Sequence, residues 1–189
     1  MDITGIILCG GRSKRMGTDK ALLKLGDETF LSRVIQTITP FCNSVVISGN
    51  NADYSSYGLT VIEDELPDSG ALGGLYSALN ASQTAWNLVL TCDAPLVDSE
   101  IIEKLRSAVD EQQKVVHAIT EKDGHPLIGF YHKSCAEVFR SAINVGSLKL
   151  QPAVNKCDPL KVLFKDEGSE KLQNINTPED YQSLLNRYG

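Results

Sequence analysis

The chain alternates short apolar runs with segments in which apolar residues recur every three or four positions. Four runs are typical of strands, at 2–10, 44–49, 59–64 and 87–93, and the last is apolar on both faces, as fully buried strands are. Three segments with helical spacing lie between or after them, at 30–38, 72–79 and 101–109. This order predicts a mostly parallel sheet with helices on both faces.

The second half of the chain adds an antiparallel element. Runs at 114–120 and 125–133 flank a polar turn around 122–124 and predict a hairpin, and 159–164 predicts a further strand. The last helix starts at Thr177, a good N-cap followed by Pro178 and Asp180, and its apolar stripe runs through 181–188. We predict a three-layer α/β fold: one domain over 1–189, a mostly parallel sheet and an antiparallel strand.

Composition and charge narrow the class of protein. With 189 residues and 42% hydrophobic content the chain can bury a real core. Eighteen basic against twenty-four acidic residues give a net charge of -6, which does not favour nucleic acid or an anionic membrane as a partner. The N-terminus lacks the basic region and the long apolar run of a secretory signal peptide. No run of about eighteen apolar residues, the length needed to span a membrane, occurs in the sequence. We therefore expect a cytoplasmic protein.

Cysteines and histidines show no metal-binding pattern. The five cysteines are scattered without a C-x-x-C pair, which argues against a disulfide framework or a zinc site and favours small buried side chains. The histidines have no ligand spacing, so we interpret all three as structural or surface groups, at His117, His125 and His132.

One stretch concentrates positive charge in this acidic chain. "LCGGRSKRMGTDKA", residues 8–21, follows the first predicted strand and contains three glycines and four cations, namely Arg12, Lys14, Arg15 and Lys20. Glycines allow backbone N–H groups to approach a ligand, and the cations match a polyphosphate, so a nucleoside triphosphate is the natural guest. Neither G-x-x-x-x-G-K-[ST] nor G-x-G-x-x-G fits here. The alternative to a nucleotide site is a basic loop that is only exposed to solvent and binds nothing.

Single polar residues elsewhere give weaker signals. Asp93 closes an otherwise apolar strand, and a carboxylate there is costly to bury without a cation or donors. Asp64, Asn174 and Asn176 are, on their own, ordinary turn residues. Only Asp93 is therefore a candidate on its own account.

The stretch 8–21 resembles the signature L-x-G-G-x-S-x-R-M-G-x-D-K of the molybdenum cofactor guanylyltransferases, within the nucleotidyltransferase superfamily. Four further segments resemble family motifs in the same order: "SGALGGL", "TCDAPLV", "HPLIGFY" and "NINTPED". Two positions depart from the pattern, Cys9 in place of alanine and Ala71 in place of proline. Neither departure removes a charge or a ligand.

The resemblance implies a Rossmann-like nucleotidyltransferase fold and a role for individual residues. The backbone of Leu8, Cys9 and Gly10 would line the nucleotide site, with Gly11 nearby. Arg15 and Lys20 would hold the triphosphate, Asp64 would contribute to the nucleoside side, and Asp93 would hold Mg²⁺. Asn174 and Asn176 would lie on the side of the acceptor. Asn50 would lie near the nucleoside, although the position that contacts the nucleoside in the family is two residues earlier and is Ser48 in this chain.

The reaction implied by the resemblance is transfer of GMP from GTP to molybdenum-molybdopterin, with release of pyrophosphate. Proteins that insert molybdenum and chaperones of molybdoenzymes are the implied partners. The alternatives are a cytidylyltransferase acting on the same cofactor and a sugar-phosphate nucleotidyltransferase, and relatives that use cytidine tend to carry alanines where Gly10 and Gly11 stand. A non-catalytic nucleotide-binding module is disfavoured because Lys20 and Asp93 are both retained.

Overall fold

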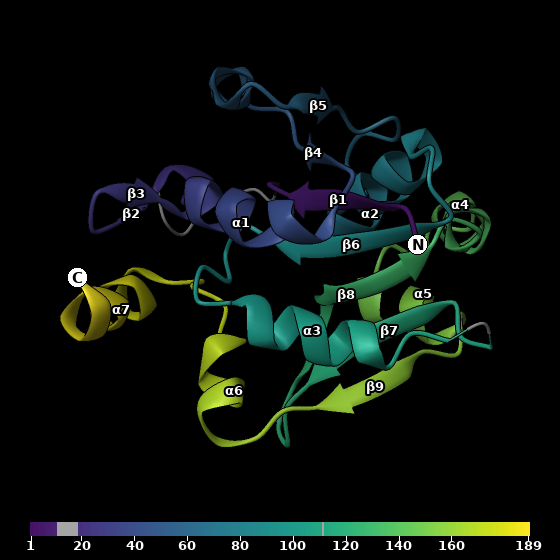
Figure 1. Ribbon diagram of the computed structural model, residues 1–189. Coiled ribbons are helices and arrows are strands. Elements are labelled where there is room, and N and C mark those ends of the chain that lie inside the picture. Colours follow the sequence, from purple (N-terminus) through teal and green to yellow (C-terminus); the bar gives the residue numbers. More distant parts are fainter. Residues whose placement is uncertain (11–18, 111) are drawn as a thin grey trace.

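A computed structural model describes residues 1–10, 19–110 and 112–189. Its centre is a seven-stranded sheet in the order β5-β4-β1-β6-β8-β7-β9 (Figure 1). The strands are β1 (Ile3–Leu8), β4 (Ser44–Ser48), β5 (Thr60–Ile62), β6 (Trp86–Thr91), β7 (Val115–Ile119), β8 (Gly124–His132) and β9 (Leu160–Leu163). Only β8 runs antiparallel to its neighbours, so the predicted mostly parallel sheet with an antiparallel strand is confirmed.

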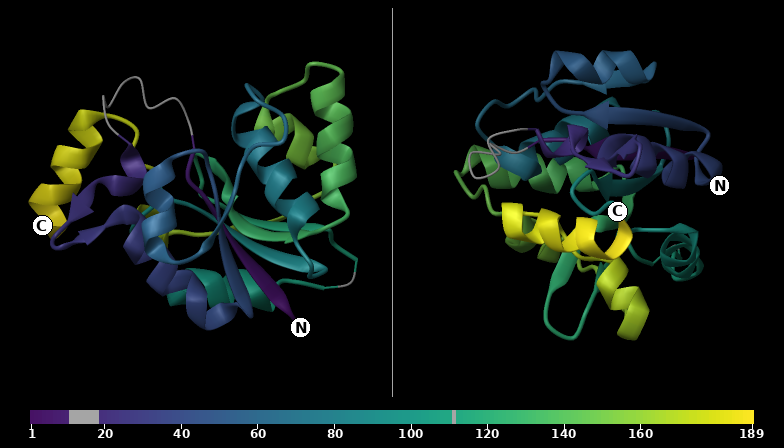
Figure 2. Two further views of the ribbon diagram at one scale, coloured as in Figure 1. Left: turned by 90° about the horizontal axis from the view of Figure 1, so that it is seen from above. Right: turned by 90° about the vertical axis from the view of Figure 1, so that its left-hand side faces the viewer.

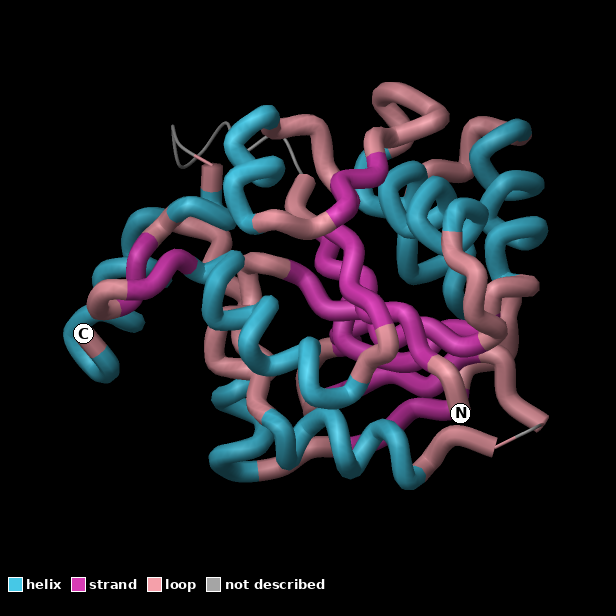
Figure 3. Tube along the Cα trace, turned by 45° about the horizontal axis from the view of Figure 1, so that its top comes forward, coloured by secondary structure: helices cyan, strands magenta, loops and turns pink. Residues whose placement is uncertain are grey.

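Helices cover both faces of the sheet, which gives the three predicted layers (Figures 2 and 3). One face carries α1 (Phe30–Ile38) and α3 (Ser99–Ser107). The other carries α2 (Gly70–Ala81), α4 (Cys135–Asn144) and α5 (Leu150–Asn155). A short helix α6 (Asp166–Lys171) follows β9, and α7 (Pro178–Tyr188) packs beside a small hairpin of β2 (Lys24–Leu25) and β3 (Glu28–Thr29). No helix in the described ranges is long and apolar enough to cross a membrane.

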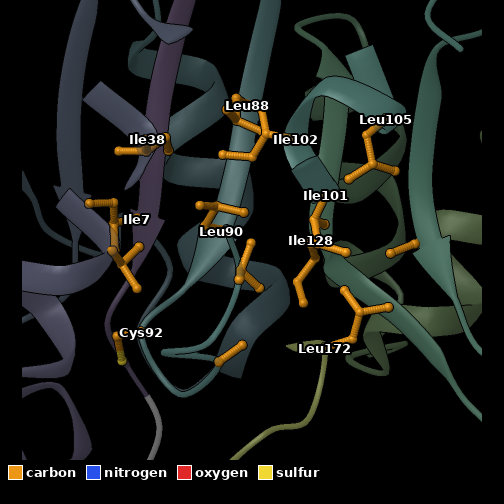
Figure 4. Close-up of a cluster of buried hydrophobic side chains, with 14 of the residues drawn as sticks. Ile7, Ile38, Leu88, Leu90, Cys92, Ile101, Ile102, Leu105, Ile128 and Leu172 are labelled. Carbon is orange, nitrogen blue, oxygen red and sulfur yellow. The ribbon is translucent and has the colours of Figure 1, made fainter. Parts of the chain in front are cut away.

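The core consists of apolar layers on either side of the sheet. Ile7 and Leu90 belong to the apolar layer on the side of α1 and α3 (Figure 4). Ile6 and Val89 belong to the layer under the helices of the opposite face. Every residue of β1 is buried, as is every residue of β6 after Trp86. Burial of both faces explains why these strands are apolar throughout.

The helix starts follow from local capping. Asp98 is the N-cap of α3, because its side chain accepts a hydrogen bond from the backbone N–H of Ile101. Thr177 and Asp180 form a capping box at the start of α7, as their spacing predicts. The predicted stripe of α7 is wrong at one position, since Tyr188 is 51% exposed at the last turn of the helix.

The parallel strands place their carboxyl ends along one edge of the sheet. Strands β4, β1 and β6 end there, and so do β7 and β9, while the turn that joins β7 to β8 lies at the same edge. The chain leaves β1 toward β4 and later crosses back to form β6 on the other side of β1. Ligands bind at such switch points, which directs attention to this edge.

The contact between β7 and β8 yields a first prediction. A Cβ at Gly129 would lie 2.3 Å from the carbonyl oxygen of Val116 and 2.8 Å from Cα of His117, so Gly129→Ala forces two paired strands apart. We expect the free energy of unfolding in urea to fall by about 1–3 kcal/mol. The matched control is Gly168→Ala in α6, where the nearest atom lies 3.4 Å away and alanine is the better helix former. Equal stability of the two variants would contradict the packing described.

Candidate functional site

The ends of β1 and β4 approach each other closely because β4 is followed by a glycine. The backbone N–H of Cys9 donates to the carbonyl oxygen of Ser48 at 2.8 Å. A Cβ at Gly49 would lie only 2.1 Å from the carbonyl oxygen of Cys9. Leu8 and Cys9 bury their side chains in the core, so the chain offers a ligand chiefly its backbone there.

Gly10 is the last residue described before the basic stretch. It is exposed, and a Cβ built on it meets no described heavy atom within 4 Å. The predicted site residues Gly11 and Arg15, like the cations Arg12 and Lys14, lie outside the described residues.

Lys20 joins two parts of the edge that are far apart in sequence. Its Nζ donates a hydrogen bond of 2.7 Å to Oδ1 of Asn176, and the same Nζ lies 3.6 Å from Oδ2 of Asp93. The side chains of Lys20 and Asp93 are only 16% and 19% exposed, so solvent screens this pair less than a surface pair. The structure thus brings together three of the predicted site residues.

Asp19 fixes the backbone just before Lys20. Its Oδ1 accepts from the backbone N–H of Ala21 at 3.0 Å, while Oδ2 accepts from Asn51 Nδ2 at 2.6 Å and from the hydroxyl of Tyr54 at 2.8 Å. The pKa of Tyr54 is raised mainly by burial and to a smaller extent by neighbouring groups that include Asp19. Its hydroxyl therefore stays protonated and can donate a hydrogen bond. The sequence prediction missed Asp19, although the D-K pair of the quoted motif contains it.

Asp93 follows β6 and is held from two directions. Its Oδ1 accepts from the hydroxyl of Thr91 at 2.8 Å, and its backbone carbonyl accepts from the N–H of Ile175 at 2.7 Å. Oδ2 has Lys20 at ion-pair distance but makes no tight hydrogen bond with it. Among the described residues no group of three or more His, Cys, Asp or Glu side chains could hold a metal ion. Asp93 is therefore not part of a cluster of such side chains within the described ranges.

Asp64 lies at the end of β5, against the glycine-rich start of α2. Its backbone N–H donates to Oδ1 of Asn50 at 3.2 Å, and burial raises the pKa of its carboxyl group. A Cβ at Gly74 would lie 3.1 Å from both Oδ1 of Asp64 and Oγ of Ser48. Ser48 is buried and donates its hydroxyl to the carbonyl of Gly74, so its polar atom is already used within the protein.

Asn174 and Asn176 stand before α7, on the side of the edge away from β4 and β5. Asn176 accepts from Lys20, whereas Oδ1 of Asn174 is buried without a hydrogen-bond partner in the part of the chain that the structure describes. Both residues line a cavity of about 760 Å³ that also touches the turn between β7 and β8.

All five cysteines are free, and four are buried, as their scattered positions predict. His117 is fully buried and its Nδ1 lies 2.9 Å from the carbonyl of Ala118. His125 is only half-buried and lines the same cavity as Asn174. The described cysteines and histidines therefore form no metal centre.

Comparison with known proteins agrees with this arrangement. Residues 5–156 match the family described as "MobA-like NTP transferase domain". A Flavobacterium johnsoniae protein named "Probable molybdenum cofactor guanylyltransferase" is 34% identical over 183 residues, which cover 96% of each chain. The Haemophilus influenzae "Molybdenum cofactor guanylyltransferase" is 30% identical over 188 residues, covering 97% of each.

A solved structure has the same fold. The Archaeoglobus fulgidus "Molybdopterin-guanine dinucleotide biosynthesis protein A" superimposes with a TM-score of 0.82 at 22% identity, covering 97% of both chains. The family match spans most of the chain, from β1 to the end of α5, and the relatives match it nearly end to end. The chain therefore belongs to the family of MobA-like NTP transferase domains.

Proposed function

We propose that this protein is a molybdenum cofactor guanylyltransferase, which transfers GMP from GTP to molybdenum-molybdopterin and releases pyrophosphate. The observation that carries the proposal is the position of Lys20, which contacts Asp93 at the end of β6 and Asn176 before α7. A cation at that point can act on a triphosphate bound over β1 and β4 and on an acceptor bound near α7. The full-length similarity to relatives named for this activity points the same way.

The chemistry requires positioning and neutralisation of charge. An oxygen of the acceptor's terminal phosphate bonds to the α-phosphorus of GTP, while the bond to the bridging oxygen breaks and pyrophosphate leaves with the electron pair. Because the phosphate nucleophile is already anionic, no general base has to remove a proton. Lys20 would neutralise charge on the triphosphate and orient it, and Asp19 would position Lys20 through its three hydrogen bonds.

The nucleotidyltransferase family indicates a divalent metal, and we propose Mg²⁺. Asp93 fits this ion, because it is an oxygen ligand at the end of a strand, and within the described ranges its Oδ2 has Lys20 at ion-pair distance but no tight hydrogen bond, so it can share a cation with substrate phosphates. When bound, the ion would neutralise phosphate charge and assist departure of the pyrophosphate. Thr91 would keep the carboxylate oriented for this task.

The nucleoside would lie over the ends of β1, β4 and β5. The backbone from Leu8 to Gly10 would line it, and the half-buried Asp64 carboxylate could accept the N1–H and N2–H₂ donors that guanine presents. Gly11 and Arg15 complete the site by resemblance alone. Asn174 and Asn176 would face the acceptor, so the N-terminal part binds nucleotide and the C-terminal part binds acceptor. Molybdenum-insertion proteins and molybdoenzyme chaperones are proposed partners for delivery and collection of the cofactor.

Removing the charge of Asp93 tests the metal assignment. Asp93→Asn keeps the shape and can still accept from Thr91, yet it loses the ligand charge. We expect turnover to fall by at least about a hundredfold at every Mg²⁺ concentration, with an unchanged melting temperature. Asp27→Asn, at an exposed turn, serves as the control. A normal rate for Asp93→Asn at saturating Mg²⁺ would remove Asp93 from the site.

Lys20 is tested against a second lysine of the same region. Lys20→Ala should slow transfer by roughly two to three orders of magnitude, the scale of one preorganised electrostatic contact. Lys24→Ala removes an exposed lysine four residues away and should leave the rate unchanged. Steady-state rates at saturating GTP and cofactor measure the difference. Similar rates for both variants would show that general positive charge, rather than the position of Lys20, matters.

The identity of the base tests the guanylyl assignment. With Mg²⁺ and molybdate-loaded molybdopterin, an equal mixture of GTP, CTP and ATP should yield mainly the guanine dinucleotide, measured by mass spectrometry. A site that satisfies guanine's donors leaves buried acceptors unpaired with the wrong base. Gly10→Ala should raise the KM for GTP without changing stability, because its methyl group meets no described protein atom.

Equal or better use of CTP by the wild-type protein would refute the guanylyl assignment and retain the nucleotidyl chemistry. Pyrophosphate release with a sugar phosphate in place of the cofactor would refute the acceptor assignment. A loss of stability in Gly10→Ala would contradict the lack of described atoms within 4 Å of a methyl group at that position.

A further inference from the structure

Two consecutive asparagines follow β4 and contact different parts of the proposed site. Oδ1 of Asn50 accepts from the backbone N–H of Asp64 at 3.2 Å, on the side where the nucleoside would lie. Nδ2 of Asn51 instead donates to Oδ2 of Asp19 at 2.6 Å. Asp19 directly precedes Lys20 in the sequence. The turn after β4 therefore contacts both the nucleoside side and the residue next to the proposed catalytic cation.

Asn51 also begins a short 3₁₀ helix, η3 (Ala52–Tyr57). Its Oδ1 accepts from the backbone N–H of Asp53 at 3.0 Å, as an N-cap does. One amide group thus holds the helix with its oxygen and Asp19 with its nitrogen. Because an amide that is turned over would lose both bonds, η3 has a defined position relative to Asp19.

Tyr54 is the residue of η3 that reaches Asp19. Its side chain is buried, and its hydroxyl oxygen lies 2.8 Å from Oδ2 of Asp19 and 3.4 Å from the carbonyl oxygen of Cys9. A phenolic hydroxyl has one proton, so the shorter contact, to a carboxylate, is the hydrogen bond that it donates. Gly49 leaves room for the ring, since a Cβ there would lie 2.7 Å from Cε2 of Tyr54. Tyr54 therefore packs between the end of β1 and Asp19.

The Asp19 carboxylate transmits this arrangement to Lys20. Its Oδ2 accepts from Asn51 and Tyr54, while its Oδ1 accepts from the backbone N–H of Ala21, on the other side of Lys20. The backbone of Lys20 is thus held from both neighbours, and a shift of Asp19 moves the lysine. A displacement of about 1 Å near a reacting centre can lower a rate about a hundredfold.

We infer that Asn51 and Tyr54 are positioning residues that act on Lys20 through the carboxylate of Asp19. They hold Asp19 against η3 and thereby place the ammonium group where it meets the charge that develops on the triphosphate. Asn50 of the same turn holds the backbone of Asp64, so the nucleoside side and Lys20 share one support. This inference rests on the proposed function and extends its machinery to the segment after β4.

The two tyrosines of η3 provide a matched pair of variants. Tyr54→Phe removes the hydroxyl beside Asp19, whereas Tyr57→Phe removes one that lies 2.8 Å from Oγ1 of Thr29. With GTP, Mg²⁺ and molybdate-loaded molybdopterin, Tyr54→Phe should lower kcat by at least about tenfold, the scale of one hydrogen bond to a charged group. The KM for GTP should stay within about twofold, because the lost interaction acts in the transition state. Tyr57→Phe should leave both constants unchanged.

A double-mutant cycle with Lys20→Ala separates positioning from a general structural role. If Tyr54 acts through Lys20, Tyr54→Phe should change kcat by less than about twofold in the Lys20→Ala background. Asn51→Asp gives a second arm of the test. It keeps the oxygen that caps η3, loses the amide donor and sets a second carboxylate against Asp19. Its loss of kcat should likewise disappear in the Lys20→Ala background.

The reactivity of Lys20 is a readout that needs no turnover. Acetylation by acetic anhydride, quantified for each lysine by peptide mass spectrometry, reports how firmly the ammonium group is held in the protein without substrates. We expect the rate at Lys20 to rise severalfold in Tyr54→Phe and Asn51→Asp, because the lysine is less constrained. Lys24 of the same molecules is exposed and should keep its rate.

The outcomes separate the inference from the proposed function. If the wild type forms no dinucleotide, the function fails, whereas faster acetylation of Lys20 in the two variants still supports the positioning. The inference is overturned if Tyr54→Phe lowers kcat as much in the Lys20→Ala background as in the wild type, if Tyr57→Phe is equally slow, or if the acetylation rate of Lys20 is unchanged. Should Tyr54→Phe not fold, the same results for Asn51→Asp would overturn it.

Discussion

The contact of Lys20 with Asp93 and Asn176 determines how the rest of the site is built. The ammonium group lies between a carboxylate at the end of a buried strand and an amide that precedes the last helix. With 16% exposure it stays in place only if its neighbours fix it, and Asp19 does so through Ala21, Asn51 and Tyr54. A positive charge held this firmly would need little reorganisation to act on the triphosphate of the proposed reaction.

Sheet topology then divides the edge into two halves. On one side, Gly10, Asn50 and Asp64 lie two residues beyond the ends of β1, β4 and β5, and this half offers backbone groups and the carboxylate of Asp64, whose pKa is raised by burial. On the other, β7 and β9 end beside an acid-rich cavity. Asp93 stands between them because β6 is the strand on which the chain switches sides. The order of strands thus sets the order in which the two substrates would meet.

The sequence predicted those strands and helices whose pattern of buried residues, or whose capping residues, can be recognised locally. Strands β1 and β6 are apolar on both faces because both faces are covered, and the start of α7 follows from a local capping box. Helix α4 was not predicted, although its buried residues recur at helical spacing, at Cys135, Ala136, Phe139 and Ala142, and pack near α2. Helices α5 and α6 have six residues each, too few for a period to show.

The site residues that could be predicted from the sequence are those that lie within a recognisable motif. Leu8, Lys20 and Asp93 stand in such segments, and the structure brings the last two together. Asp19 stands in one as well, but its carboxylate acts through partners 32 and 35 residues away, which no local pattern reveals. His125 depends still more on the fold. The pairing of β7 with β8 shifts register between His117 and Ala118. Within this irregular part of β8, the hydroxyl of Tyr131 donates a hydrogen bond to the carbonyl oxygen of Pro126.

The irregular pairing has a consequence for the acceptor side. A regular hairpin would keep pairing outward from Gly129, whereas here His117 pairs with Gly129 and the next residue, Ala118, pairs with His125. Three residues of β8 are thereby displaced from the ladder, which re-aims the strand where it approaches the cavity. Such bulges are common next to active sites because they turn a side chain away from the sheet. In this chain the bulge places His125 at the cavity wall, and among the described residues its buried Nε2 has no hydrogen-bond partner.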